Sequence, residues 1–185
     1  MAGNSPRKRD AEATRARILA AAQRAFSETG YSHTGIRDIA RIAGTSSTLL
    51  LRYFGSKAGL FEAALIAAMP ASATLDWGKD SYATSLADAL LTPESEVRPP
   101  VMIALAAGDP EAAMIAARVT ERHAIAPLAE WLGGERANER AVAVAALATG
   151  FVTYLRQLPL TNLSDEERLR LRAWFVASVD ALIAG

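Results

Sequence analysis

A short polar stretch carries the side chains best suited to bind an anion. Residues 45–48 read Thr-Ser-Ser-Thr, and Arg52 and Lys57 follow soon after them. Hydroxyl groups can cap a helix start, and cations attract phosphate, so this combination suits contact with an anion. The stretch predicts noncovalent recognition of a polyanion.

Two cations stand at the N-termini of expected helices, where the helix dipole disfavours them. Arg37 lies in the first turn after Thr34, and Lys57 directly follows Ser56, a suitable helix cap. An acidic residue at such a position would stabilise the helix by roughly 0.3–1 kcal/mol. A bound phosphate reverses the preference, because the helix N–H groups and the cation then bind the same anion. The pattern favours phosphate contact over the alternative, in which both cations are simply solvated.

The distribution of charge along the chain points the same way. Residues 1–58 hold ten Lys or Arg against four Asp or Glu, whereas the remainder holds ten against sixteen. A basic first third joined to an acidic remainder is typical of a polyanion-binding module attached to a second region. An unevenly charged surface that is only solvated would have the same counts.

The chain offers little for catalysis or metal binding. It has two histidines, His33 and His123, no cysteine, and none of the motifs HExxH, GxSxG or a phosphate-binding loop. We therefore expect no enzyme activity, no cofactor and no metal site. The lack of cysteine favours an intracellular protein, and no uncharged run reaches the ~18 apolar residues that a membrane span needs. The expected location is the cytoplasm, with no membrane partner.

Helical signals fill the chain, and sustained alternation of apolar and polar residues is absent. In the first third, helices are expected over residues 10–28, from the cap Thr34 to Gly44, from a cap at Thr45 or Ser46 to Phe54, and over 57–69. A boundary is expected near residues 70–79, and beyond it helices are expected over 81–91, 99–107, 110–131, 136–158 and 164–183. Pro127 should kink or break the third of these helices, and Ser164 should begin the last one with a capping box. The fold class is therefore all-α, with about nine helices.

Two of the short helices meet the requirements of a helix-turn-helix. Gly44 lies at the turn, small Ala40 lies where the helices cross, and Leu50 points inward. Each residue advances a helix by about 100°, so Leu49 and Leu51 lie to either side of Leu50 and at least one of them faces outward.

The segment TGIRDIARIAGTSSTLLLRYFGSKAGLFEAAL, with the helix from Arg15 to Tyr31 before it, resembles the DNA-binding region of the tetracycline-repressor (TetR-type) family of bacterial transcription regulators. The likeness covers about residues 14–65. It implies a three-helix DNA-binding domain with a basic arm over residues 1–56, and a helical regulatory and dimerisation domain over 57–185. It also implies a homodimeric repressor that binds a palindromic operator in double-stranded DNA and is released by a small-molecule effector.

The resemblance assigns roles to single positions. Base-edge or groove contacts fall to residues at and after the turn: Thr45, Ser46, Ser47, Thr48, Leu51 and Arg52. Phosphate contacts fall to four positions around them: Thr34, Arg37, Tyr53 and Lys57. The basic arm, Arg7, Lys8 and Arg9, adds backbone or minor-groove contacts. Leu51 replaces a tyrosine that is frequent in the family, so it offers a contact to a thymine methyl but no hydrogen bond.

The last two long helices are the expected dimer face, because small side chains there let a second helix approach closely. The residues chosen for this face are Ala141, Ala145, Ala148, Trp174, Phe175 and Val179. The alternative is that both helices are core helices of a monomer.

A small-molecule pocket is expected in the second region, where methionine and aromatic residues could line an apolar cavity. The candidate residues are Trp77, Met102, Met114, Arg118, His123, Phe151 and Tyr154. The alternative is that the apolar members are plain core and the polar members belong to a solvated helix face.

Two further classes of function stay open. A protein-interaction bundle, whose basic third attracts acidic partners, predicts no preference among DNA sequences. An amphipathic membrane-surface protein needs a basic face opposite a large apolar one. The alanine-rich helices instead lie in the acidic part of the chain.

Overall fold

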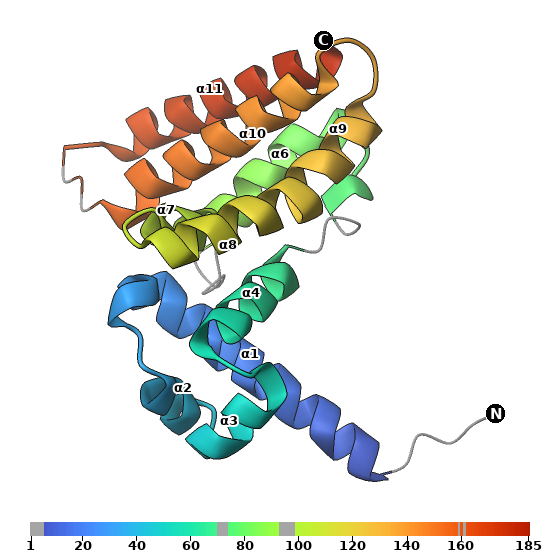
Figure 1. Ribbon diagram of the computed structural model, residues 1–185. Coiled ribbons are helices and arrows are strands. Elements are labelled where there is room, and N and C mark those ends of the chain that lie inside the picture. The colour runs from blue at the N-terminus through green and yellow to red at the C-terminus, as the bar shows by residue number, and fades with distance from the viewer. Residues whose placement is uncertain (1–5, 70–73, 93–98, 159, 161) are drawn as a thin grey trace.

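The computed structural model describes residues 6–69, 74–92, 99–158, 160 and 162–185, although the side chains of residues 6–9 lie outside that description. Within these ranges every regular element is a helix and none is a strand. Figure 1 shows a lower lobe built from the first helices and an upper lobe built from the later ones, in which α10 and α11 run side by side. The expected all-α fold is confirmed.

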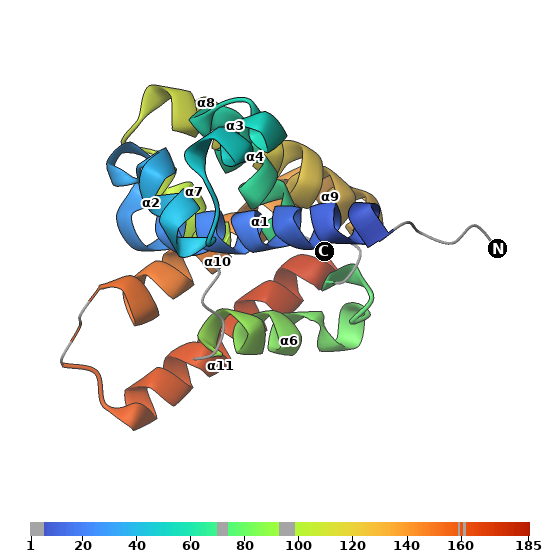
Figure 2. The same cartoon turned by 90° about the horizontal axis from the view of Figure 1, so that it is seen from below.

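The first lobe packs four helices around one core. They are α1 (Pro6–His33), α2 (Ile36–Ile42), α3 (Ser47–Phe54) and α4 (Lys57–Ala68). Seen from below, α2 and α3 lie on one side of α1 (Figure 2). All four helices bury side chains together, among them Ile18, Phe26, Ile39, Leu50 and Phe61. Full burial of each such side chain contributes roughly 1.5–3 kcal/mol, which holds α2 and α3 in a fixed mutual orientation.

The second lobe is a helical bundle. They are α6 (Lys79–Leu91), α7 (Pro99–Ala106), α8 (Pro110–Thr120), α9 (Ala126–Leu132), α10 (Ala137–Val152) and α11 (Asp165–Ala184). A second core joins α6, α9, α10 and α11, and within it Phe151 stacks on Phe175 with ring centroids 4.2 Å apart. Helices α10 and α11 lie side by side at the top of Figure 1.

Helices α4, α7 and α8 join the two lobes. Met102 and Ala106 of α7 and Ile115 of α8 are buried in the first core rather than the second. Helix α4 contacts both α1 and α8. A displacement of α8 would therefore change its packing against α4. The division of the chain between residues 56 and 57 stays a prediction.

Three predicted helix caps are present. Ser46 and Ser56 each accept the backbone N–H three residues further on, at 3.1 and 3.0 Å. Ser164 and Glu167 form the expected capping box at the start of α11. Such caps depend only on local sequence and each contributes roughly 0.5–2 kcal/mol, which is why they could be predicted.

Two helix starts differ from the expectation. Helix α1 begins at Pro6, so the basic arm belongs to the helix. Gly35 rather than Thr34 caps α2, because the Thr34 hydroxyl donates to the Gly30 carbonyl at 2.6 Å instead. Gly30 has φ 74°, a left-handed conformation that glycine adopts without strain. It interrupts α1 close to the predicted end of the first helix.

The helix predicted over residues 110–131 is divided, as Pro127 suggested. A π-helical turn, η1 (Glu121–Ile125), separates α8 from α9, and Pro127 lies in the first turn of α9. Proline has no N–H to donate, and the wider π turn accommodates the change in hydrogen bonding. A second π turn, η2 (Thr153–Gln157), follows α10.

Candidate DNA-binding interface

Helix α3 turns its three leucines in three directions. Leu50 is fully buried, Leu49 is half-buried and Leu51 is 40% exposed. This confirms the orientation predicted from the helical angle. Thr48 and Arg52 are also exposed, so the outer face of α3 carries a hydroxyl, a cation and one apolar side chain.

The N-terminal end of α3 presents hydroxyl groups. Ser46 is exposed, and Thr45 and Ser47 are half-buried. Ser46 Oγ accepts the N–H of Leu49 as the helix cap. A hydroxyl that accepts one hydrogen bond still has its own proton to donate, so Ser46 can cap α3 and contact a DNA oxygen at once.

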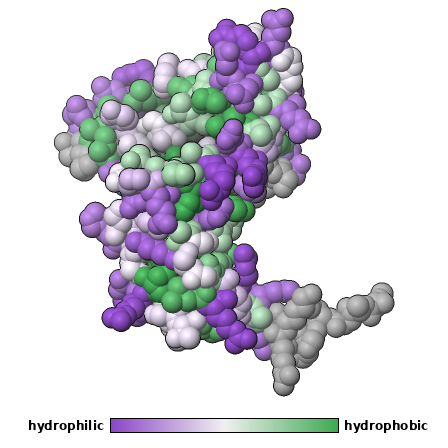
Figure 3. Space-filling model, viewed as in Figure 1, coloured by the Kyte–Doolittle hydropathy of each residue, from purple (hydrophilic) through white to green (hydrophobic). Residues whose placement is uncertain are grey.

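Two arginines of α2 and α3 are available to an anion. Arg37, in the first turn of α2, and Arg52, in the last turn of α3, are exposed and form no ion pair within the described part of the chain. Arg41 differs, because Asp38 lies 3.7 Å from its guanidinium. Figure 3 shows hydrophilic residues around an apolar patch on this lower lobe. Exposed cations without an ion-pair partner suit a phosphate backbone.

Tyr53 and Lys57 are half-buried, and each contacts another part of the first lobe. The Tyr53 hydroxyl donates to the Ala11 carbonyl at 3.4 Å, which ties α3 to α1. The Lys57 ammonium lies 4.4 Å from the centroid of the Tyr31 ring, at the N-terminus of α4. Since both side chains keep partial exposure, contact with phosphate is compatible with their placement.

Thr34 is an exception among the residues that were predicted to contact DNA. Its side chain is 4% exposed, and its hydroxyl lies 2.6 Å from the Gly30 carbonyl and 2.8 Å from the Thr29 hydroxyl. The predicted phosphate contact by this side chain is wrong, because a hydroxyl that is buried and already hydrogen-bonded cannot reach the DNA backbone. Thr34 instead stabilises the turn between α1 and α2.

The basic arm lies at the start of α1. The backbone of Arg7, Lys8 and Arg9 is helical, whereas their side chains fall outside the described part of the structure. Their contact with DNA stays a prediction.

Comparison with known proteins supports the helix-turn-helix geometry. The description "Bacterial regulatory proteins, tetR family" matches residues 18–64, which contain α2 and α3. The description "Tetracyclin repressor-like, C-terminal domain" matches residues 80–183, more than half of the chain. The chain belongs to the tetR family of bacterial regulatory proteins.

Individual members of the TetR family resemble the chain to different extents. The HTH-type transcriptional regulator TtgR of Pseudomonas putida is 41% identical over 58 residues, which are 31% of this chain and only 28% of that protein. A TetR-family transcriptional regulator from Rhodococcus sp. is 21% identical, with a TM-score of 0.71 over 93% of this chain and 99% of the other. NalD, the secondary repressor of the MexAB-OprM multidrug efflux pump in Pseudomonas aeruginosa, is 21% identical, with a TM-score of 0.63 over 91% and 96% of the two chains. The two structures show a shared fold.

This TetR-family regulator does not bring its seven predicted pocket residues together. Met102 is buried in the first core, whereas Met114 is 71% exposed on α8. Trp77 packs beside Tyr82 on the second core, with ring centroids 5.9 Å apart. These three members of the set cannot line one cavity, because they belong to two cores and an open surface.

The polar members of the predicted pocket also lie apart from a cavity. Arg118 pairs with Glu62 of α4 at 2.9 Å, so it joins the two lobes. His123 is half-buried in η1. Arg118 and His123 were both predicted to line the pocket, yet the Arg118 side chain points toward Glu62 of α4.

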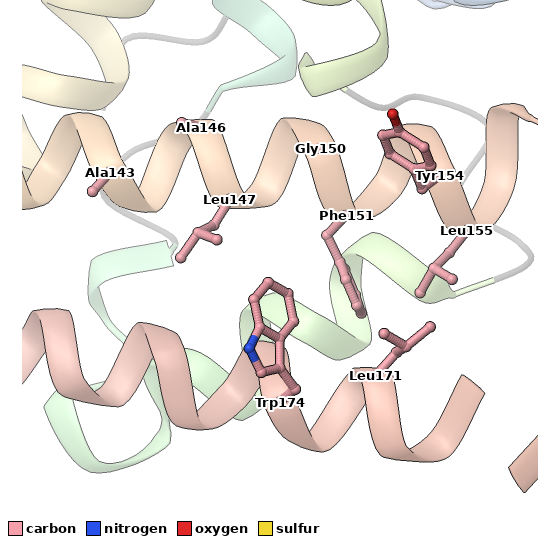
Figure 4. Close-up of a pocket in the computed structure, with 9 residues that line it drawn as sticks. All are labelled: Ala143, Ala146, Leu147, Gly150, Phe151, Tyr154, Leu155, Leu171 and Trp174. Carbon is pink, nitrogen blue, oxygen red and sulfur yellow. The ribbon is translucent and has the colours of Figure 1, made fainter. Parts of the chain in front are cut away.

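A groove of about 590 Å³ lies between α10 and α11 (Figure 4). It is lined by apolar and aromatic residues: Ala143, Ala146, Leu147, Gly150, Phe151, Tyr154, Leu155, Leu171 and Trp174. Phe151 and Tyr154 are the two predicted pocket residues that it includes. Ala146 and Gly150 lie four residues apart on one helix face, and both are small residues of the kind from which close approach of a second helix was predicted.

The predicted dimer face is wrong for four of its residues. Ala141, Ala148, Phe175 and Val179 are buried in the second core of their own chain, so a partner cannot contact them. Ala145 is half-buried, and Trp174 is 54% exposed. Helices α10 and α11 carry apolar residues on several faces, so their pattern did not distinguish the face that the core covers.

Neither a metal site nor a membrane-spanning helix is found among the described residues. No group of three or more His, Asp or Glu side chains there could hold a metal ion. None of the helices in those ranges combines the length and apolar character needed to cross a membrane.

Proposed function

We propose that the protein is a homodimeric transcriptional repressor that binds an inverted-repeat operator and is released from it by a small molecule. The observation that carries this proposal is the outer face of α3. Thr48, Leu51 and Arg52 are exposed there, while Leu50 anchors the helix in the core. A short helix that is held rigidly and presents donors outward fits the major groove of DNA.

The side chains around α3 divide into two roles. Arg52 can make paired hydrogen bonds to a guanine edge, and Leu51 can contact a thymine methyl. Arg37 lies in the first turn of α2 and Lys57 begins α4, on either side of α3 in the chain. At these helix N-termini they bind phosphates. The first pair therefore sets sequence preference, and the second pair sets overall affinity.

The partner that best fits the groove between α10 and α11 is a second copy of the chain. Trp174 and Tyr154 line this groove and are 54% and 61% exposed. Exposed apolar surface of this kind marks an interaction site. Two-fold symmetry lets the same surface of each copy cover the other. It also directs two α3 helices at the two halves of an inverted repeat.

NalD, which has a similar fold, is described as a repressor. Our proposal extends repression to this chain and adds release by a small molecule. A small molecule releases DNA if it binds more tightly to a form in which the two α3 helices miss successive major grooves. The packing of α8 against α4 offers a path for this change, because it joins the second lobe to the DNA-binding lobe.

Selection of genomic fragments with the purified full-length protein tests the DNA-binding part of the proposal. We expect an enriched inverted repeat, bound at least about 10³-fold more tightly than random DNA, with affinity that falls steeply as salt rises. Equal binding of selected and random DNA would overturn the proposal and favour a protein-interaction bundle. Repression is tested by transcription from the selected fragment, which should fall when the protein is added.

A thermal-shift screen of small molecules tests the release part. A compound that stabilises the protein should also weaken its binding to the selected operator. A set of stabilising compounds that all leave operator affinity constant would contradict ligand-driven release without affecting the DNA-binding part.

A further inference from the structure

The two lobes meet where α1 ends and α8 begins, and charged groups gather there. The Tyr31 hydroxyl donates to Glu111 Oε2 at 2.5 Å, and the Ser32 hydroxyl donates to Asp109 Oδ2 at 3.0 Å. The Lys57 ammonium lies 4.4 Å from the centroid of the Tyr31 ring. These five side chains, called the junction cluster here, connect α1, α4 and the start of α8.

The Tyr31 ring is held by the first core. Its centroid lies 6.0 Å from that of Phe26 and 5.2 Å from that of Phe61, and the side chain is buried. Burial, followed by the hydrogen bond to Glu111, raises the pKa of the Tyr31 hydroxyl well above its ordinary value, so this hydroxyl stays a donor. An ammonium over an aromatic face is attracted by the ring. Lys57 therefore rests on a surface whose position the core determines.

The Asp109 carboxylate contacts both lobes. Its Oδ1 accepts the N–H groups of Glu111 and Ala112 at 3.0 and 3.1 Å, which caps α8, while its Oδ2 accepts from Ser32. The pKa of Asp109 is lowered chiefly by the Ala112 N–H, with the Lys57 charge also contributing, so the carboxylate is anionic.

The Lys57 ammonium is influenced by these acids without being paired to either. No ion pair among the described residues includes Lys57. Glu111 accepts from Tyr31, whose ring centroid lies 4.4 Å from the lysine ammonium, and Asp109 accepts from the next residue, Ser32. The Lys57 charge is also among the causes that lower the pKa of Asp109. Charges closer than a Debye length of about 10 Å are only partly screened by salt. The two carboxylates therefore lower the positive potential that a phosphate would meet at Lys57.

We propose that Asp109 and Glu111 are positioning residues that weaken DNA binding by restraining Lys57. Both acids belong to the start of α8, so a displacement of α8 changes the restraint. The second lobe can thus adjust DNA affinity through one cation, without moving α3. This inference rests on the proposed function, in which Lys57 contacts phosphate.

Charge-only substitutions in the full-length protein test the inference. Glu111→Gln keeps an oxygen that can accept from Tyr31, and Asp109→Asn keeps a good helix cap. By fluorescence anisotropy at low salt, each should bind the selected operator and random DNA about threefold more tightly than the unsubstituted protein. Glu139→Gln, which removes an exposed charge from α10 in the second lobe, is the matched control and should leave affinity unchanged.

The same substitutions are then made together with Lys57→Met. If the acids act through Lys57, the threefold gain should disappear in this background. Unchanged or weaker binding by Glu111→Gln and Asp109→Asn, with normal thermal unfolding, would overturn the inference, and so would a gain that persists without Lys57. Should one variant unfold, the other decides.

The failures of the two proposals are distinguishable. If the unsubstituted protein prefers its operator but Lys57→Met alone binds as tightly, Lys57 does not contact phosphate. The inference then fails while the proposed function stands. If the unsubstituted protein shows no preference for any DNA, both fail.

Discussion

Two exposed helical surfaces of this chain differ in chemistry and therefore in the partner that each suits. The outer face of α3 presents hydroxyls, a guanidinium and one leucine, whereas the groove between α10 and α11 is lined by apolar and aromatic side chains. Base edges and phosphates need donors and cations, and a protein partner gains from apolar burial. Exposure alone does not identify what a surface binds, since the chemistry of the exposed atoms decides it.

The largest expected effect comes from a charge placed in the apolar groove. Trp174→Glu should separate the dimer, because burying an unpaired carboxylate against a second copy is costly. Operator affinity should then fall by about 10²–10⁴-fold, since two linked DNA-reading modules become one. Sedimentation and mobility shift measure the two results. Trp174→Phe, which keeps an apolar ring, should stay dimeric; a dimeric Trp174→Glu protein would place the interface elsewhere.

A second pair of substitutions compares the inner and outer faces of α3 itself. Leu50→Ala should lower the free energy of unfolding by about 2–5 kcal/mol, because it leaves a cavity in a packed core. Leu51→Ala should change it by less than about 0.5 kcal/mol and reduce discrimination at a thymine instead. Urea titrations at one protein concentration measure both. Comparable loss of stability in the two variants would contradict the orientation of α3.

Removing the guanidinium from the outer face should change preference more than stability. Arg52→Ala should cost about 1–3 kcal/mol of discrimination at one base pair, because a paired contact to a base edge is lost. Binding to a panel of single-base operator variants measures this. A uniform loss over all variants would reassign Arg52 to the phosphate backbone.

The smallest expected change in DNA affinity comes from substituting Lys57. Lys57→Met should weaken operator and random DNA about equally, by a few-fold, and lower the slope of log affinity against log salt by about 1. Arg136→Met, which removes an exposed cation at the start of α10, should leave both quantities as they are. A loss confined to the operator would mean that Lys57 contacts a base.

The features that sequence predicted correctly depend on residues close together in the chain. The caps at Ser46, Ser56 and Ser164 use N–H groups three residues away. The different orientations of Leu50 and Leu51 follow from the angle of about 100° per residue. The family resemblance rests on residues 14–65, and the match over residues 18–64 agrees with it.

The errors lie where chemistry alone leaves several placements open. Thr34 has the composition of a cap and of a phosphate contact, and only the fold of the Gly30 turn buries its hydroxyl. Phe175 and Trp174 are neighbours with similar chemistry, yet one is fully buried and the other is 54% exposed. On helices that are apolar on several sides, periodicity does not distinguish the face that packs on the chain's own core.

By itself, then, the sequence determined the helices, the caps at Ser46, Ser56 and Ser164, the helix-turn-helix and the basic character of the DNA-binding lobe, because these follow from local hydrogen bonding, helical angle and composition. Tertiary structure alone decided which apolar side chains of α10 and α11 remain exposed, and that Tyr31 meets Glu111, 80 residues away. Such placements come from the packing of whole helices against each other, and the free energy of that packing is shared among many residues that no local pattern contains.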